Sequence, residues 1–410
     1  MIDEHAEAPS SDTQVPRRLP RFVAILGVIS LLTAMSSAMV YGLLPVFLVK
    51  VLGASTASVG FIEGIAEAMM SFARISSGLA SDWMGRRKPL VLLGYAVSAI
   101  NKVMFPLAGA VSMVLAARVI DRIGKGLRDA PRDAFMTDVT PTKIRGSGFG
   151  LRLAFYTTGF VVGPLVAMGL MKLSGDDFRL VFWIAVIPAA MAIGVLFFGI
   201  KEKAPKRINH RPLRFRRGDL AFFPEPYWWA VAIASLLSLA RFSYAFLILK
   251  AHDIGIDAAF VPIMLVLMHV VYAAAAYPFG VLADHMDRRL QLGIGAVVLI
   301  GADIVLATAN AGWMTGVGAG LWGLQLAVTQ GLLSASIADA APVELRGTAF
   351  GIYDLSVGLA TFVASAAAGA LWMAGGPLLA FGFSGLIAAA AVLLLLFQWM
   401  SAGRQLASAR

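Results

Sequence analysis

The chain has 410 residues, of which 59% are hydrophobic and 14% are charged, and its net charge is +10. Soluble domains average about 45–50% apolar and about 25% charged residues, so this composition excludes an ordinary soluble protein and predicts an integral membrane protein. The sequence contains no cysteine, which excludes disulfide bonds and thiolate metal sites.

Apolar segments of helical length recur along the whole chain. Backbone amides in lipid need partners within their own segment, so apolar segments of about 20 residues are predicted to be transmembrane α-helices. In chain order they span 21–49, 56–81, 89–109, 112–139, 144–173, 178–200, 226–250, 258–283, 289–309, 313–340, 345–373 and 376–401. The predicted fold class is therefore an all-α membrane protein with twelve transmembrane helices.

Polar segments divide these helices into two halves of six. Residues 1–20 form a polar tail without the apolar core of a signal peptide. The first six helices lie in 21–200, a basic linker occupies 201–225, the other six lie in 226–402, and 403–410 form a second tail. The linker is too short to fold alone, so we expect no separate catalytic or sensory domain.

The distribution of lysine and arginine predicts the orientation in the membrane. Outside the helix interiors, 21 basic residues fall on the side of the N-terminus and four on the other side, Lys50, Lys172, Arg179 and Lys250. Cytoplasmic loops carry the excess of positive charge, so we expect both tails in the cytoplasm and the protein in the cell inner (plasma) membrane. The positive charge is then a topology signal in contact with membrane lipid, and nucleic acid is not an expected partner.

Two sequence motifs recur at nearly the same offset. The segment GLASDWMGRR (78–87) matches GVLADHMDRR (280–289), 202 residues later, and DVTPTKIRGSGFG (138–150) matches DAAPVELRGTAFG (339–351), 201 residues later. Each pair follows the second or the fourth helix of its half. The halves are therefore parallel repeats, an arrangement that favours a transporter with a central site between them.

The segment 78–87 resembles the loop signature of the major facilitator superfamily, Gly-x-x-x-Asp-x-x-Gly-Arg-Arg. The match is carried by Gly78, Asp82, Gly85, Arg86 and Arg87. The second copy keeps Gly280, Asp284, Arg288 and Arg289 but has Asp287 in place of the glycine. The resemblance covers the full chain and implies a monomeric secondary transporter without cofactor or catalytic residues. It further implies that Gly78, Asp82, Gly85, Arg86, Arg87, Asp284, Arg288 and Arg289 form a conformational latch.

The fifth predicted helix contains GFVVGPLVAMG, with Gly159, Gly163 and Pro164. This segment resembles the Gly-x-x-x-Gly-Pro-x-x-Gly-Gly signature of antiporters in the same superfamily. Ala167 and Met168 stand where the final glycine pair would be. Ordinary close packing is the alternative interpretation, because small residues four positions apart bring helices together.

The fourth predicted helix, 112–139, carries far more charge than its neighbours. At 100° per residue its charged side chains share one face about 140° wide; they are Arg118, Asp121, Arg122, Lys125, Arg128, Asp129, Arg132 and Asp133. Charges inside a membrane are costly, so they point inward and pair. Glu63 and Glu67 on the second helix lie at the depth of Arg118 and Arg122, and we expect these groups to pair. A structural ion-pair network and a wet transport cavity are both open interpretations.

The resemblance to a drug:proton-antiporter-like bacterial subgroup of the superfamily implies proton-coupled export of a small solute. The candidate proton carriers are Glu63, Glu67, Asp121 and Asp129. The candidate cavity residues are Arg118, Arg122, Lys125, Arg128, Arg132, Tyr244, Gln325 and Gln330. The alternative is uptake or exchange of a small organic or inorganic anion, which the net positive charge of the fourth helix would bind. We expect no metal site, since the sequence has no His/Glu metal motif.

Overall fold

The computed structural model describes residues 21–84, 86–140, 144–199, 223–283, 285–342 and 345–408. The first half contains Arg21–Tyr41 (α1), Leu44–Val46 (α2), the π-helix Phe47–Val51 (η1), Thr56–Met84 (α3), Lys88–Asn101 (α4), Met104–Leu107 (α5), Val111–Val139 (α6), Arg145–Ser174 (α7) and Phe178–Gly199 (α8). The second half contains Glu225–Ala240 (α9), Ala245–Asp253 (α10), Ile263–Ala283 (α11), Arg288–Thr308 (α12), Gly312–Ala340 (α13) and Arg346–Ser408 (α14).

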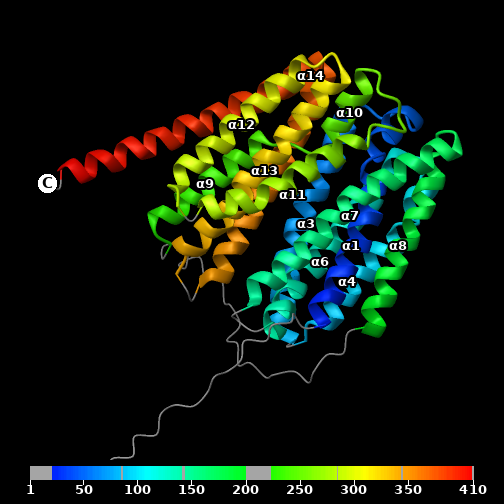
Figure 1. Ribbon diagram of the computed structural model, residues 1–410, viewed down its shortest axis with the longest axis horizontal. Coiled ribbons are helices and arrows are strands. Elements are labelled where there is room, and N and C mark those ends of the chain that lie inside the picture. Colours follow the sequence, from blue (N-terminus) through cyan, green and yellow to red (C-terminus); the bar gives the residue numbers. More distant parts are fainter. Residues whose placement is uncertain are drawn as a thin grey trace, which may run out of the picture.

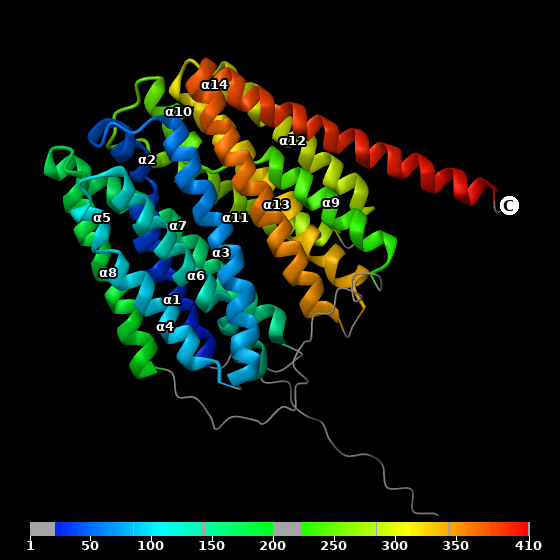
Figure 2. The ribbon, with the colours of Figure 1, turned by 180° about the vertical axis from the view of Figure 1, so that it is seen from behind.

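These helices form two bundles that lie side by side, α1–α8 in blue to green and α9–α14 in green to red (Figures 1 and 2). In the first bundle, α6 packs between α3 and α4, and α1 packs against α7 and α8. In the second bundle, α13 packs against α11 and α12, while α14 packs against α9 and α12. The charged helix α6 thus lies inside the first bundle. Charges within a membrane are tolerated in the interior of a bundle.

Helix occupies every one of the twelve predicted ranges, although length and apolar composition by themselves select only eight segments of the described chain as able to cross a membrane. Outside that selection lie α3 and α6, which carry many charges, and α13. The last selected segment, 348–398, includes the backbone break at Gly375 and Gly376, which separates two of the predicted helices.

Some predicted helix bounds are wrong. The predicted helix 258–283 begins only at Ile263, directly after Pro262, and the residues before it form turns. Predicted helix 226–250 is interrupted, since α9 ends at Ala240 and α10 begins at Ala245. The final helix does not end at 401 but continues to Ser408.

The two bundles pack against each other at only one side of the molecule. We call the side where α8 ends and α9 begins the linker side, and the opposite side the far side. On the far side a single hydrophobic core combines residues of both halves, including Phe47 and Phe182 with Phe246 and Phe381. Toward the linker side each half has its own core, for example Leu26 with Met136 in the first half. The halves are therefore packed together on the far side and separate toward the linker side.

The contact between the halves on the far side relies on glycines. Helix α3 packs along α14, and α7 packs along α11. A Cβ atom on Gly369 would lie 2.7 Å from the carbonyl oxygen of Thr56 and 3.1 Å from the Cα atom of Gly60. Lys172 Nζ and Asp257 Oδ2 form an ion pair of 2.8 Å that also joins the halves on this side.

Candidate functional site

The first ion pair of helix α6 joins it to α3. Arg118 donates from Nε to Oε1 of Glu63 over 2.7 Å and from Nη2 to Oε2 over 2.6 Å. Both side chains are buried, with 1% and 4% of their surfaces exposed. The two-point geometry matches the planar guanidinium to the carboxylate and makes this a strong, directional contact.

A second ion pair lies one turn further along the same two helices. Arg122 Nη2 lies 2.5 Å from Glu67 Oε1. Both arginines also donate to the hydroxyl of Tyr244, Arg118 over 3.3 Å and Arg122 over 3.2 Å. Tyr244 belongs to the second half, so these ion pairs of the first half are in contact with the second bundle.

The break between α9 and α10 supplies these contacts. Ser243 Oγ donates to Glu63 Oε2 over 3.1 Å, and the Ser243 amide donates to Ser365 Oγ of α14, also over 3.1 Å. The amide is thereby satisfied without a helical partner. Residues 241–244 thus link the charge network of one half to the helices of the other.

Asp121 is held by a third group of contacts. Lys102 Nζ lies 3.2 Å from Asp121 Oδ1, and the hydroxyl of Tyr41 donates to Asp121 Oδ2. The guanidinium carbon of Arg118 lies 3.9 Å from the centre of the Tyr41 ring, in a cation–π contact. Sequence reasoning missed Tyr41, because a single tyrosine in an apolar helix carries no periodic signal.

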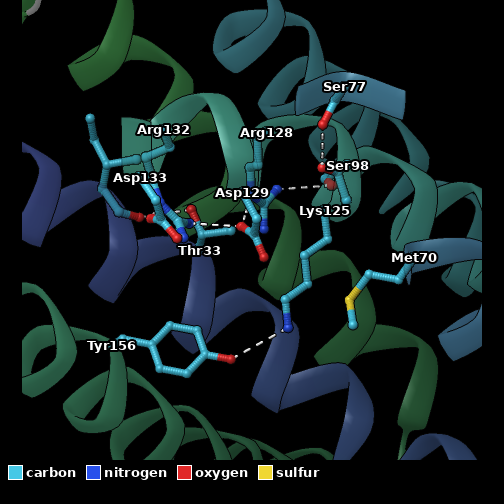
Figure 3. Close-up of polar contacts among 12 residues, drawn as sticks. Thr33, Met70, Ser77, Ser98, Lys125, Arg128, Asp129, Arg132, Asp133 and Tyr156 are labelled. Atoms are coloured by element: carbon cyan, nitrogen blue, oxygen red, sulfur yellow. Dashed lines mark hydrogen bonds and ion pairs between the residues drawn. The ribbon is translucent and has the colours of Figure 1, made fainter. Parts of the chain in front are cut away.

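A separate cluster occupies the linker-side end of α6 (Figure 3). Arg132 bridges Asp129 over 2.8 Å and Asp133 over 3.0 Å. Arg152 of α7 lies 3.7 Å from the same Asp133 carboxylate. Arg128 donates to Ser98 Oγ over 2.9 Å. The charges in this linker-side cluster therefore neutralise one another only in part.

Lys125 stands apart from these pairs. Its Nζ lies 3.5 Å from the hydroxyl of Tyr156 (Figure 3). Within the described part of the chain, no carboxylate oxygen lies within 4 Å of it. Lys125 is thus a cation near the middle of a membrane protein whose nearest polar partner is a neutral phenol.

Two adjoining cavities lie between the halves. The charged chamber, about 250 Å³, is lined by first-half residues and by Gln330. The polar chamber, about 400 Å³, is lined mainly by second-half residues and by Glu67 and Arg74. Gln330 and Arg74 line both chambers, and Arg74 Nη1 lies 3.6 Å from Asp354 Oδ2 of the second half. The chambers therefore meet at the boundary between the two bundles.

The structure divides the predicted site residues between these cavities and the buried pairs. Lys125, Arg128, Arg132 and Asp129 line the charged chamber, and Glu67, Tyr244, Gln325 and Gln330 line the polar chamber or both. Arg118, Arg122, Glu63 and Asp121 line neither chamber and are buried in their ion pairs.

The charged chamber has an excess of positive charge. Among the described residues its lining contains five cations, Arg74, Lys125, Arg128, Arg132 and Arg152, and two anions, Asp129 and Asp133. No group of three His, Asp or Glu side chains is placed to hold a metal ion within the described residues. A polar cavity of this kind, at the boundary between two helical repeats, suits the binding of a small solute.

The sequence profile of the Major Facilitator Superfamily matches residues 26–250 and again residues 229–405. The chain belongs to the Major Facilitator Superfamily. An uncharacterised MFS-type transporter of Methanocaldococcus jannaschii is 31% identical over 387 residues, which cover 93% of this chain and 96% of that protein. The inner membrane transport protein YajR of Escherichia coli is 26% identical over 345 residues, which cover 81% of this chain and 73% of that protein.

Solved structures agree with this membership at the level of the fold. A mutant of the nucleoside transporter NupG superimposes with a TM-score of 0.75 at 13% identity, covering 92% of this chain and 99% of that chain. The predicted fold class is confirmed: the chain is an all-α, multi-pass membrane protein with two helical halves. It is a secondary transporter and not an enzyme.

The superfamily loop signature is described only in part. The Asp82 side chain, Gly85 and Asp284 lie outside the described residues. Gly78 lies in ordinary contact with α6, since its Cβ would be 3.7 Å from Ala130 Cβ. Arg86 is exposed on the linker side.

The remaining signature residues contact groups within their own half. Arg87 donates to Ser81 Oγ over 2.9 Å, Arg288 pairs with Asp339 over 2.7 Å, and Arg289 donates to the Gln398 carbonyl over 3.5 Å. Asp287, which replaces the signature glycine, caps α12 by accepting from the Arg289 and Leu290 amides. An N-cap carboxylate satisfies two otherwise free amides, which accounts for the departure from the superfamily pattern.

The antiporter-like segment of this superfamily member packs α7 against α1. A Cβ atom on Gly159 would lie 2.5 Å from the Leu31 carbonyl oxygen, and one on Gly163 would lie 2.5 Å from the Met35 carbonyl oxygen. Pro164 lies inside α7. These glycines therefore allow close contact between α7 and α1.

Proposed function

We propose that the chain is a proton-coupled transporter that exports a small solute by alternating access, as a monomer in the cell inner membrane. The observation that carries this proposal is the position of Glu67. It lines the polar chamber, its side chain is 20% exposed, and its only ion-pair partner among the described residues is Arg122. Glu63 and Asp121 are enclosed, with side chains 4% and 3% exposed.

A change in the protonation of Glu67 would alter the contact between the halves. A proton on Glu67 removes the charge that holds Arg122, and Arg122 also donates to Tyr244 of the other half. Loss of the ion pair frees the guanidinium to move with or away from that bundle. Protonation of a cavity carboxylate would in this way bias the equilibrium between two arrangements of the halves.

The charge distribution supports the proposed orientation in the membrane. The fifth-helix signature supports the proposed direction of transport. If the basic linker side is cytoplasmic, as the positive-inside rule predicts, both termini are cytoplasmic and this conformation faces the cytoplasm. The superfamily loop residues, Asp82 with its neighbours, would close the linker side in the opposite state. Export is supported by the partial antiporter signature at Gly159, Gly163 and Pro164.

A second candidate function is the transport of a small anion, by uptake or exchange. It is favoured by two cations that face the chambers without a carboxylate within 4 Å in the described chain, Lys125 of the first half and Arg241 of the second. Cations from opposite halves could hold one anionic solute between them. Such a contact would form only when both halves enclose the solute.

The test uses purified protein in liposomes that contain a pH-sensitive dye. Cations, neutral compounds and organic anions are added one at a time across an imposed pH gradient. We expect proton movement on adding a transported compound, its loss in Glu67→Gln, and its retention in Glu225→Gln, which changes an exposed carboxylate at the start of α9.

The same assay separates the two candidate functions. Proton movement that survives in Glu67→Gln would contradict the assigned role of Glu67. Uptake of a labelled anion without proton movement, lost in Lys125→Ala, would replace proton-coupled export by the anion carrier.

A further inference from the structure

One buried carboxyl group has no cationic partner among the residues that the structure describes. Asp303 of α12 is 1% exposed, and no nitrogen of a lysine, arginine or histidine lies within 4 Å of its oxygens in the described chain. Glu63 and Asp121, which are equally buried, each have a basic partner. A lone carboxylate at such a position would be costly, because nothing replaces its hydration.

The groups that contact Asp303 come from two elements, α13 and α14, and a third element, α9, contacts Asp303 only through Ser384. Trp322 of α13 donates from Nε1 to Asp303 Oδ1 over 3.3 Å. Ser384 of α14 places Oγ 2.5 Å from Asp303 Oδ2. The same Ser384 hydroxyl contacts the carbonyl oxygen of Ala240, the last residue of α9. No charged side chain of these elements takes part in the described contacts.

The hydrogen atoms at Ser384 do not suffice for both of its contacts. A serine hydroxyl donates a single hydrogen bond, whereas Ser384 Oγ lies against two acceptors, the Ala240 carbonyl and Asp303 Oδ2. The carbonyl has no hydrogen to give. The second contact is therefore satisfied only if the hydrogen comes from Asp303 itself.

We propose that Asp303 is a proton-binding site of the second half, which holds its proton in this conformation and is tied through Ser384 to the break between α9 and α10. Asp303 donates to Ser384, and Ser384 donates to Ala240. The carboxylic acid is then neutral, which agrees with the absence of a cation around it in the described part of the chain. The site is separate from Glu67 and lies behind Trp322, which lines the polar chamber.

The contact with Ala240 links this proton to the break in the seventh predicted helix. In a continuous helix the Ala240 carbonyl would accept from the amide of Tyr244. Residues 241–243 are not helical, and Ser384 supplies the hydrogen bond instead. The following residues, Ser243 and Tyr244, contact Glu63 and the arginines of the first half.

Closure of the break would change the state of Asp303. Once the Tyr244 amide bonds to Ala240, the Ser384 hydroxyl is free to turn and donate to Asp303. This favours the ionised carboxylate, and the O–H bond of Asp303 breaks with transfer of the proton to water. This coupling to the transport cycle rests on the proposed proton-coupled function, whereas the protonation of Asp303 in the present conformation does not.

Infrared spectroscopy of the purified full chain at neutral pH tests the site directly. We expect the carbonyl stretch of a protonated carboxylic acid in the wild type, its loss in Asp303→Asn, and its retention in Glu225→Gln. In Ser384→Ala we expect the band to shift to higher frequency, because the acid loses its acceptor. This variant keeps the carboxyl group of Asp303, so it tests the proposal even if Asp303→Asn does not fold.

The outcomes are distinct from those of the transport assay. A spectrum in which neither Asp303→Asn nor Ser384→Ala changes an acid band would overturn the proposal. An acid band assigned to Asp303, together with liposomes that show no proton movement with any compound, would support the site and contradict the proposed proton-coupled export.

Discussion

At the scale of single residues, the ion pairs of α6 follow from helical geometry. The shared face and the depth of Arg118 and Arg122 predict the pairing with Glu63 and Glu67 that the structure shows. The salt bridge between Arg74 and Asp354 could not be predicted, because it depends on which helices of different halves become neighbours. Helical periodicity determines the face of a residue but not the partner opposite that face.

We predict that Glu63→Gln lowers the free energy of unfolding by about 3–5 kcal/mol, because it leaves the Arg118 guanidinium buried without a counter-ion. The measurement is denaturation of the purified protein in detergent. The double variant Glu63→Leu/Arg118→Leu, which removes both charges, should lose much less. Equal losses in the two proteins would show that the unpaired charge is not the cause.

At the scale of helices, apolar length predicts where helix forms but not where it is interrupted. The start of α11 has a local signal in Pro262, since proline is favoured at a helix start and disfavoured inside. The break at 241–244 contains neither glycine nor proline. It is stabilised by the hydroxyl groups of Ser365 and Ser384 on α14, which are more than 100 residues away in the sequence. Such a tertiary cause leaves no pattern in the helix itself.

We predict that Gly159→Ala destabilises the packing of α7 on α1 by about 1–3 kcal/mol, the usual cost of overpacking. The added Cβ would lie 2.5 Å from the Leu31 carbonyl and 2.7 Å from Ala34 Cβ. Gly169→Ala, in the same helix, is the matched control, because nothing lies within 4 Å of its Cβ position. Thermal unfolding in detergent would refute the prediction if the two variants had the same midpoint.

At the scale of the whole molecule, the repeated motifs predict two halves but not how these halves meet. A transporter has at least two arrangements of similar free energy, so the sequence encodes both. The shared core on the far side and the separate cores toward the linker side define the arrangement seen here. It brings Lys172 and Asp257 together on the far side.

We predict that acid weakens this far-side contact. The hydrogen bond from Lys172, with a smaller effect of the Ala259 amide, lowers the pKa of Asp257 below its usual value. The stabilising contribution is therefore present above the usual pKa of an aspartate and is lost as the pH falls through the lowered pKa. Asp257→Asn should remove it at every pH.

A single cysteine provides the readout for Asp257, because the chain has none of its own. Ala368→Cys, buried in the far-side core, should react with a thiol reagent faster at low pH, and faster at all pH values in the Asp257→Asn background. Asp253→Asn, which changes an exposed residue nearby, is the control. Rates that are the same in all three backgrounds would refute the prediction.

In the proposed transport cycle the two halves exchange between this arrangement and one closed on the linker side. Distances between paired spin labels test it most directly. One pair, Leu173→Cys with Trp313→Cys, lies on exposed positions of the far side, and the other, Phe198→Cys with Leu290→Cys, lies on exposed positions of the linker side. When pH or an added compound is varied in reconstituted protein, we predict that far-side distances lengthen as linker-side distances shorten. Distances that stay fixed at both sides under every condition would contradict alternating access in this chain.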